Sequence, residues 1–350
     1  MPLSYPRFKA AACHIASVFL DSEATVEKGI SFIREAAKNG ASLVAFPESF
    51  LPGFPVWAAL RSPIENHDFF RALAMQSVLR DGEEVARLCA AARESGIYVS
   101  VGISESTQAS VGCLWNSNLL IGPDGRILNH HRKLVPTFYE KLIWANGDAR
   151  GLRVVPTDIG RLGMLICGEN TNPLSRYALM AEGEQVHIST YPPIWPTRPP
   201  TDNTGYDLRR AIEIRAGAHA FEAKVFNIVS SSLADEKLIA AVAKDDKRIR
   251  EIIERSPKSM SMFLDPTGSV MGPVLSDEEG IVYGEIDTAL SVEPKQFHDV
   301  VGYYNRFDIF DLKIDRSARE PARFIEAADI ATTPESEDSR PNGHMHRGVP

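Results

Sequence analysis

Short apolar runs that alternate with segments of helical periodicity constrain the fold of this chain more than any other feature. Each run is too short for a buried helix and is bounded by Gly, Pro or polar residues, so each predicts a buried strand. The runs cover residues 8–15, 41–46, 97–103, 161–167, 186–190 and 225–230. Apolar spacing predicts helices over 23–38, 83–95, 174–181 and 206–222, with a Pro- and aromatic-rich loop to about Phe70. Strands in two groups with helices outside predict a layered α/β sandwich.

The bulk composition is that of a globular enzyme. The chain has 350 residues, 44% of them hydrophobic, which is enough for a substantial core. A net charge of -8 argues against a nucleic-acid partner. No apolar run approaches the ~18 residues of a membrane-spanning helix, and the N-terminus lacks the pattern of a secretory signal. We therefore expect a cytoplasmic protein without a membrane partner.

The four cysteines give no sign of a metal site or a disulfide framework. Cys13, Cys89, Cys113 and Cys167 lie far apart and include no Cys-x-x-Cys spacing. The first three have apolar surroundings, and we expect them in the core. No metal ligand set is predicted.

Cys167 differs from the others because it ends an apolar run and precedes Gly168-Glu169-Asn170. This pattern predicts a buried strand with a sharp exit into a helix. At such a strand end, backbone N–H groups and a helix N-terminus are expected to favour the thiolate and to hold a developing anion. The alternative is an inert core cysteine, which is the commoner case when a cysteine in an apolar strand stands alone.

Two further ionisable residues also follow predicted strands. Glu48 comes after the run 41–46 and Pro47, and Lys133 ends the return strand of a hairpin that turns at residues 122–125. Taken singly, each is better explained as a solvated loop charge. Together with Cys167 they supply a nucleophile, a general base and a cation for developing negative charge.

At these residues the chain resembles the nitrilase (carbon–nitrogen hydrolase) superfamily. Its motifs are similar to Phe46-Pro47-Glu48, His131-Arg132-Lys133 and the strand around Cys167. Residues 52–57 and 183–187 resemble the true nitrilase and cyanide-hydrolysing branch. The resemblance implies a four-layer αββα sandwich and no cofactor. It also implies Glu48 as general base, Lys133 as the oxyanion residue, Cys167 as nucleophile and Glu140 as a second structural or catalytic glutamate.

The same resemblance points to a substrate side near the thiol. The expected substrate-binding residues are Trp57, Gly168, Glu169, Tyr191 and Pro192, although 191–200 could equally be a surface connection. The chain departs from the family where Gly168-Glu169-Asn170 replaces the usual Trp-Glu-His. The hydrogen of Gly168 either leaves room beside the thiol or lets another side chain fill it. A second departure is Tyr303, where the family often has a histidine.

The function implied is hydrolysis of a small-molecule nitrile to the acid and ammonia, with some amide as a possible by-product. An amidase, carbamoylase or cyanide-hydrolysing enzyme of the same superfamily uses the same residues and stays open. A non-catalytic assembly protein is disfavoured because a scaffold has no need of Glu48, Lys133 and Cys167 together. Which nitrile is used is not fixed by the sequence.

The C-terminal end bears on domain organisation and assembly. We expect residues 1–331 to form the hydrolase domain and 332–350 a disordered tail. The resemblance implies a homo-oligomer, a dimer that extends into a spiral or filament. The aromatic stretch from Gln296 to Leu312 is the candidate contact, with packing onto its own domain as the alternative.

Overall fold

The strands form one continuous sheet that divides into two groups. In the computed structural model, which describes residues 3–199 and 205–317, the strand order is β5-β4-β3-β2-β1-β9-β8-β7-β6. Strands β10, β11 and β12 pair beside this path, with β12 on β1 and β10 on β9. The predicted tail 332–350 lies outside the described residues.

The first group of strands comes from the N-terminal part of the chain. Its elements are β1 (Arg7–Ile15), α1 (Ser22–Lys38), β2 (Leu43–Ala45), α2 (Trp57–Leu60), the 3-10 helix η1 (Pro63–Glu65), α3 (His67–Gln76), α4 (Glu83–Ser95), β3 (Tyr98–Glu105), β4 (Trp115–Ile121) and β5 (Ile127–Arg132).

The rest of the chain supplies the second group, except that β12 returns to pair with β1 of the first group. Its elements are the 3-10 helix η2 (Phe138–Leu142), β6 (Val155–Thr157), β7 (Gly160–Ile166), the 3-10 helix η3 (Cys167–Thr171), α5 (Pro173–Ala181), β8 (Val186–Tyr191), α6 (Leu208–Ala223), β9 (Phe226–Ser232), α7 (Glu236–Ala243), α8 (Lys247–Arg255), β10 (Ser261–Leu264), β11 (Val270–Leu275), β12 (Gly280–Asp287), η4 (Thr288–Ser291) and α9 (Val292–Phe297).

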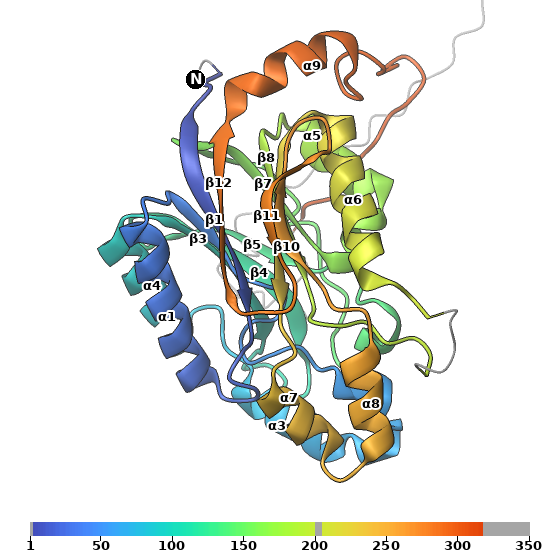
Figure 1. The fold of residues 1–350 in the computed structure, drawn as a ribbon. Coiled ribbons are helices and arrows are strands. Elements are labelled where there is room, and N and C mark those ends of the chain that lie inside the picture. Colours follow the sequence, from blue (N-terminus) through green and yellow to red (C-terminus); the bar gives the residue numbers. More distant parts are fainter. Residues whose placement is uncertain (1–2, 200–204, 318–350) are drawn as a thin grey trace, which may run out of the picture. The chain divides into compact units, whose positions relative to one another are not determined.

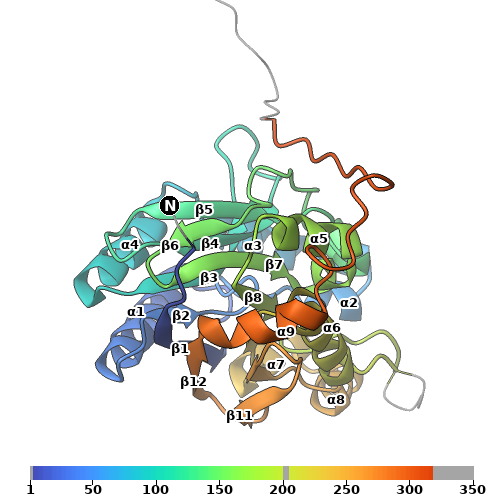
Figure 2. The same cartoon turned by 90° about the horizontal axis from the view of Figure 1, so that it is seen from above.

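Alternation of side chains along the strands creates the layers. Ala11 and Cys13 of β1 pack with α1 and α4, whereas Ala10 and Ala12 face the second group of strands. On the far side, the cluster that contains Ile166 of β7 includes residues of α6. Figure 1 and Figure 2 show α1 and α4 on one flank of the strands and α5 and α6 on the other. The predicted order of helix, sheet, sheet and helix is confirmed.

The two groups join through β1 and β9. His14 pairs with Ser231, and Ile15 pairs with Ser232, in parallel register. Ser230 Oγ adds side-chain hydrogen bonds to the carbonyl oxygens of Cys13, at 2.8 Å, and of Ala45, at 3.0 Å. One buried hydroxyl therefore ties β9 to both β1 and β2.

Local sequence explains where the main helices begin and end. Asp21 caps α1 by accepting from the Ala24 N–H, and Asn172 caps α5 by accepting from the Leu174 N–H. Helix α4 ends at Gly96, whose φ of 66° lies in the left-handed region that glycine adopts without strain. These helices were predicted within one residue of their observed ends.

Three predictions need correction. The loop expected up to Phe70 contains the short helices α2 and α3. Cys89 and Cys113 are only partly buried: Cys89 packs at the margin of the core cluster that includes α4, and Cys113 lies in the turn before β4. Helices α7 and α8 and strand β12 occupy stretches for which the sequence analysis predicted no element.

The helices give no sign of a membrane-spanning segment. Across the part of the chain that the structure describes, no helix is both long enough and apolar enough to cross a bilayer.

Candidate active site

Glu48 lies where the chain leaves β2 and is fully buried. Its Oε1 accepts from Asn116 Nδ2 and from Lys133 Nζ, each at 2.7 Å. Its Oε2 is also buried and has no hydrogen-bond partner among the described residues. One carboxylate oxygen is therefore fixed by two donors, and the other is free to accept a proton.

The backbone around Glu48 is held by a close approach of β3. A Cβ added to Gly102 would lie 2.2 Å from the Pro47 carbonyl oxygen and 2.5 Å from the Ser49 nitrogen. No side chain fits between the two backbones, so only glycine serves at this position. The glycine places Glu48 against the sheet.

Lys133 follows β5 and is buried between two carboxylates. Its Nζ lies 2.7 Å from Glu48 Oε1 and 2.8 and 2.6 Å from the two oxygens of Glu140. Burial alone would lower the pKa of Lys133, but the carboxylates of Glu140 and Glu48 raise it above its usual range. The ammonium is therefore charged and its three hydrogens already face acceptors.

Glu140 lies in η2 and completes this charge cluster. It also accepts from the backbone N–H of Thr137 at 2.9 Å. Burial raises the pKa of Glu140 to about 7, with Lys133 opposing the rise and Glu48 adding to it. Two buried carboxylates share a single ammonium, so negative charge is under-compensated here.

Cys167 is the first residue after β7, as predicted, and its thiol is buried. Sγ, an oxygen of Glu48 and an oxygen of Glu140 all lie within 4.8 Å of one another. Burial and then the Glu48 carboxylate raise the pKa of the Cys167 thiol above its usual range, although Lys133 lowers it. The expectation that the surroundings favour the thiolate is therefore wrong for the resting site, because desolvation outweighs the nearby cation.

Backbone strain is concentrated at the same place. Ser49, Phe138 and Cys167 have φ values of 48°, 47° and 48°, in the left-handed region that residues other than glycine rarely adopt. Ser49 directly follows Glu48, Phe138 lies two residues before Glu140, and Cys167 is the proposed nucleophile itself. Strained residues of this kind persist where the surrounding structure fixes them, and they cluster at functional sites.

Glu169 was expected to contact substrate, but its carboxylate is turned inward. Oε1 accepts from the Leu134 N–H at 2.6 Å, and Oε2 from the Ile166 N–H and His131 Nε2, both at 2.9 Å. Burial opposes ionisation, yet His131 and these N–H groups lower the pKa of Glu169. The carboxylate is fully occupied in bracing the turn at Cys167, which corrects the expected substrate contact.

A buried polar network that the sequence analysis did not predict lies on the same side of Cys167 as Glu169. Asn170 Nδ2 donates to the Cys167 carbonyl at 3.1 Å, and its Oδ1 lies 2.9 Å from His187 Nε2. Glu184 then joins His187 Nδ1 at 2.7 Å and His219 Nε2 at 2.6 Å. His187 and His219 hold the pKa of Glu184 at about 2 despite its burial. Because His219 lies on α6, this network connects α6 to the backbone carbonyl of Cys167.

Only part of this network had a signal in the sequence. Glu184 and His187 belong to the segment 183–187 that carries the resemblance, but His219 is one histidine among nine and lies on a helix. Asn116, which fixes Glu48 Oε1, was likewise missed. It belongs to the polar series Asn116-Ser117-Asn118 in β4, which is uncommon in a buried strand and could have marked a site.

The remaining predicted substrate residues lie in or beside an aromatic cluster around the thiol. Trp57 and Tyr191 are fully buried members of the cluster that contains Cys167, and Pro192 is buried next to Tyr191. The Trp57 ring stacks on the Phe69 ring with 5.4 Å between their centroids, and this packing fixes the orientation of the Trp57 ring. The cluster also includes Phe54, Tyr139, Trp144 and Trp195. Segment 191–196 is thus not a surface connection.

The space that a side chain at position 168 would need is already occupied. An added Cβ would lie 2.6 Å from Thr137 Oγ1. The sequence left two possibilities: open room beside the thiol, or another side chain that fills it. The second is correct, because the Thr137 side chain occupies the volume beside Gly168.

Two sets of residues have the composition of metal ligands within the described chain. They are Glu48, Glu140 and Cys167, and Glu184, His187 and His219. Lys133 already pairs with both carboxylates of the first set, and Glu184 pairs with both imidazoles of the second. A cation would have to displace these partners.

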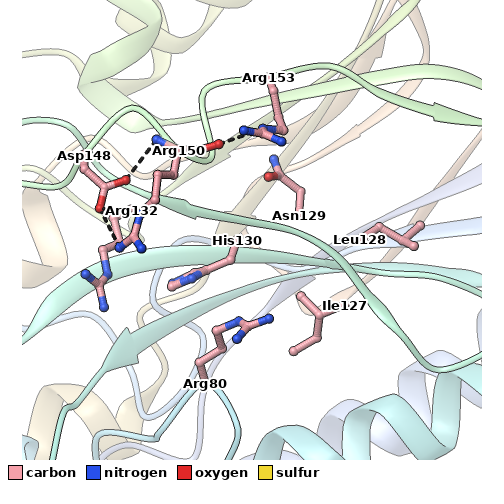
Figure 3. A pocket seen from close by; sticks show the side chains of 9 residues that line it. All are labelled: Arg80, Ile127, Leu128, Asn129, His130, Arg132, Asp148, Arg150 and Arg153. Atoms are coloured by element: carbon pink, nitrogen blue, oxygen red, sulfur yellow. Dashed lines mark hydrogen bonds and ion pairs between the residues drawn. The ribbon is translucent and has the colours of Figure 1, made fainter. Parts of the chain in front are cut away.

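A basic hollow on the surface is a separate feature (Figure 3). It holds about 280 Å³ and is lined by Arg80, Ile127, Leu128, Asn129, His130, Arg132, Asp148, Arg150 and Arg153. Arg132 pairs with Glu105 and lies over the Trp115 ring, while Arg150 pairs with Asp148. Its lining includes neither the thiol nor the buried charge cluster, and two of its arginines are neutralised by carboxylates.

Comparison with known proteins places this site in a family. A model of the carbon–nitrogen hydrolase family matches residues 9–296. A cyanide hydratase of Botryotinia fuckeliana is 36% identical over 329 residues, which cover 91% of this chain and 86% of the relative. A nitrilase of Penicillium rubens is 32% identical, with 91% of this chain and 97% of the relative covered.

The fold has counterparts among solved structures. The crystal structure of a carbon–nitrogen hydrolase from Helicobacter pylori G27 superposes with a TM-score of 0.69 at 21% identity, covering 87% of this chain and 96% of that one. The chain belongs to the carbon–nitrogen hydrolase family, in the branch of nitrilases and cyanide hydratases, and is a hydrolase that acts on carbon–nitrogen bonds.

Proposed function

We propose that the protein hydrolyses an organic nitrile to the carboxylic acid and ammonia through a covalent intermediate on Cys167. The observation that carries this proposal is that the two carboxylate oxygens of Glu48 differ in their contacts. Oε1 is fixed by Asn116 and Lys133, and Oε2 is buried without a partner in a carboxylate beside the thiol. Because the thiol is protonated at rest, it needs a base at the moment of attack, and Glu48 Oε2 is suited to that role.

The first half of the reaction forms the carbon–sulfur bond. Cys167 Sγ attacks the nitrile carbon while Glu48 takes the thiol proton and passes it to the nitrile nitrogen, which gives a thioimidate. Lys133 and the Gly168 N–H stabilise the negative charge that develops on nitrogen. In the resting site Glu140 takes two of the Lys133 contacts, so Lys133 must loosen one of them to reach the substrate.

The second half releases the products. Glu48 deprotonates a water that adds to the thioimidate carbon, and the tetrahedral species expels ammonia to leave a thioester. A second water hydrolyses the thioester to the acid and frees the thiol. If the tetrahedral species expels the thiol instead of ammonia, one water is consumed and an amide results.

That amide branch is the second candidate function. It is favoured by the similarity to a cyanide hydratase, whose named reaction adds water without releasing ammonia. Quantifying acid, amide and ammonia separately from a panel of nitriles and cyanide distinguishes the two. Ammonia equal to acid supports the nitrilase, and amide without ammonia supports the hydratase.

The covalent step is tested on Cys167. Cys167→Ala removes one thiol from a buried position and is expected to abolish turnover while the far-UV circular dichroism stays unchanged. Mass spectrometry of wild type quenched with acid during turnover is expected to show a thioimidate or acyl adduct on the peptide that contains Cys167. Turnover above a few per cent in Cys167→Ala would remove this residue from the mechanism.

Assembly and location complete the proposal. Phe297, Tyr303, Tyr304, Phe307 and Phe310 are exposed rather than packed on their own domain, which favours a homo-oligomer built through this stretch. We expect light scattering to give a dimer or a larger open assembly, and a monomer would contradict it. The four free cysteines fit the reducing cytoplasm.

A further inference from the structure

A second cation lies near the thiol, on helix α6. Arg215 is half-buried, and its Nη2 donates to the Tyr206 hydroxyl at 2.6 Å. Its helix packs against η3, which begins at Cys167. The residues that flank it on the buried face, Ile212 and Ala216, belong to the same cluster as Cys167. Arg215 therefore lies beside the packed cluster that contains the nucleophile.

Arg215 and Cys167 also influence one another electrostatically. Burial and Glu48 raise the pKa of the Cys167 thiol, whereas Lys133 and Arg215 lower it. Burial acts to lower the pKa of Arg215 in turn, but Cys167, Tyr191 and Tyr206 raise it. The field of Arg215 thus reaches the reacting sulfur.

The described residues give Arg215 no ionic partner. Within residues 3–199 and 205–317, no carboxylate lies at ion-pairing distance from its guanidinium. Other half-buried arginines are compensated: Arg132 pairs with Glu105, and Arg61 and Arg161 donate to backbone carbonyls. A guanidinium withdrawn from water without an anion is costly, so the site keeps donors available for a ligand.

The cluster between Arg215 and the thiol is rich in aromatic side chains. Tyr139 stacks on Trp195 at 4.3 Å, Trp195 lies 6.1 Å from Phe54, and Tyr206 packs against the same cluster. A ligand that reached the thiol through this cluster would meet the buried charge cluster at one end, apolar side chains in the middle and the Arg215–Tyr206 pair at the other end.

We propose that Arg215 and Tyr206 bind a carboxylate on the substrate, so that the enzyme acts on nitriles that carry a carboxylate separated from the nitrile by a short apolar spacer. The guanidinium matches a carboxylate with two N–H donors, and the Tyr206 hydroxyl can add a third. This assignment rests on the proposed nitrile hydrolysis, and it makes Arg215 a specificity-determining residue.

The first test compares charged and neutral nitriles of the same shape. The substrates are ω-cyano carboxylates with one to four methylene groups and analogues in which an isopropyl group replaces the carboxylate, with ammonia release as readout. At one chain length or more, we expect wild type to prefer the carboxylate. Arg215→Gln should raise KM for the carboxylate about 10- to 100-fold, with kcat and the neutral substrate little changed. Arg215→Lys should recover part of the loss, and Arg210→Gln, on the exposed face of α6, is the matched control.

Two outcomes would overturn the proposal. One is a wild type that prefers the neutral nitrile at every chain length. The other is an equal fall in kcat for both substrates in Arg215→Gln, which would mean that Arg215 acts on the thiol rather than on the substrate.

The second test does not depend on nitrile hydrolysis. Iodoacetate and iodoacetamide alkylate the same thiol and differ in charge, and the peptide that contains Cys167 is followed by mass spectrometry. The ratio of the two rates cancels any change in thiol pKa. We expect this ratio to fall about tenfold in Arg215→Gln and to stay constant in Arg210→Gln. An unchanged ratio would refute anion binding at Arg215. A fallen ratio without ammonia from any nitrile would refute nitrile hydrolysis and leave anion binding supported.

Discussion

The carboxylates on the two sides of Cys167 are held in different ways. On one side, Glu48 and Glu140 share the single ammonium of Lys133, and burial raises the pKa of Glu140 to about 7. On the other side, Glu184 has two imidazoles and Glu169 has one imidazole and two N–H groups, and both pKa values are lowered. Glu140 can exchange a proton near neutral pH, whereas Glu184 and Glu169 stay ionised. The side with Glu140 is therefore suited to proton transfer, and the side with Glu184 and Glu169 to holding the structure rigid.

The largest effect is expected from removing the shared cation. Lys133→Met leaves two buried carboxylates without a partner and removes the charge that stabilises the transition state. We expect turnover to fall by about 10³-fold or more, and unfolding free energy to fall by roughly 3–5 kcal/mol unless a carboxylate takes up a proton. Nitrile kinetics and urea unfolding measure the two losses. Lys141→Met, at an exposed position of η2, is the control. Normal turnover in Lys133→Met would remove this residue from the mechanism.

Removing the charge of Glu184, on the fully compensated side of Cys167, should affect stability more than turnover. Glu184→Gln keeps the shape but weakens the hydrogen bonds to His187 and His219. We expect a loss of about 1–3 kcal/mol in unfolding free energy, with turnover per folded molecule reduced far less than in Lys133→Met. Glu293→Gln on the exposed face of α9 serves as control. A loss of activity as large as that of Lys133→Met would erase the distinction between the two sides.

The pH dependence of stability should separate the same two carboxylates. Glu140 has a raised pKa in the fold, so its contribution is present below its usual pKa of 4.5 and is lost as pH rises to about 7. Glu184 has a lowered pKa, so its contribution is present above 4.5 and is lost as pH falls toward 2. Urea unfolding at a series of pH values should show Glu140→Gln flattening only the upper range and Glu184→Gln only the lower. Each effect is on the order of 3 kcal/mol, and identical profiles for both variants would contradict the assignment.

The smallest effect concerns the contact beside the thiol. Gly168→Ala places a methyl group at the position now 2.6 Å from Thr137 Oγ1, so Thr137 must rotate. We expect a few-fold loss in kcat and a cost of about 1–2 kcal/mol in stability. Thr137→Ala combined with Gly168→Ala should recover most of both. A double variant no better than the single one would show that Thr137 is not the obstacle.

The sequence predicted the elements that carry the motifs well, because strand ends and helix caps are encoded locally. Glu48, Lys133 and Cys167 each follow a recognisable break in an apolar pattern, Glu140 was implied by the resemblance alone, and the structure brings all four together. What could not be predicted depends on long-range contacts. Neither the neutral state of the thiol nor the inward turn of Glu169 has a local signal, since both follow from burial. Asn116 and His219 gain their importance only from partners 68 and 35 residues away.

The junction between β1 and β9 has a consequence for how activity appears during folding. Glu48 and Lys133 come from the first group of strands and Cys167 from the second, while residues 217 positions apart, such as Cys13 and Ser230, tie the groups together. Docking of such distant segments is slow to form because the loop between them must first close. Secondary structure can therefore return on refolding before any turnover does, and the recovery of catalysis reports the meeting of the two halves rather than the folding of either one.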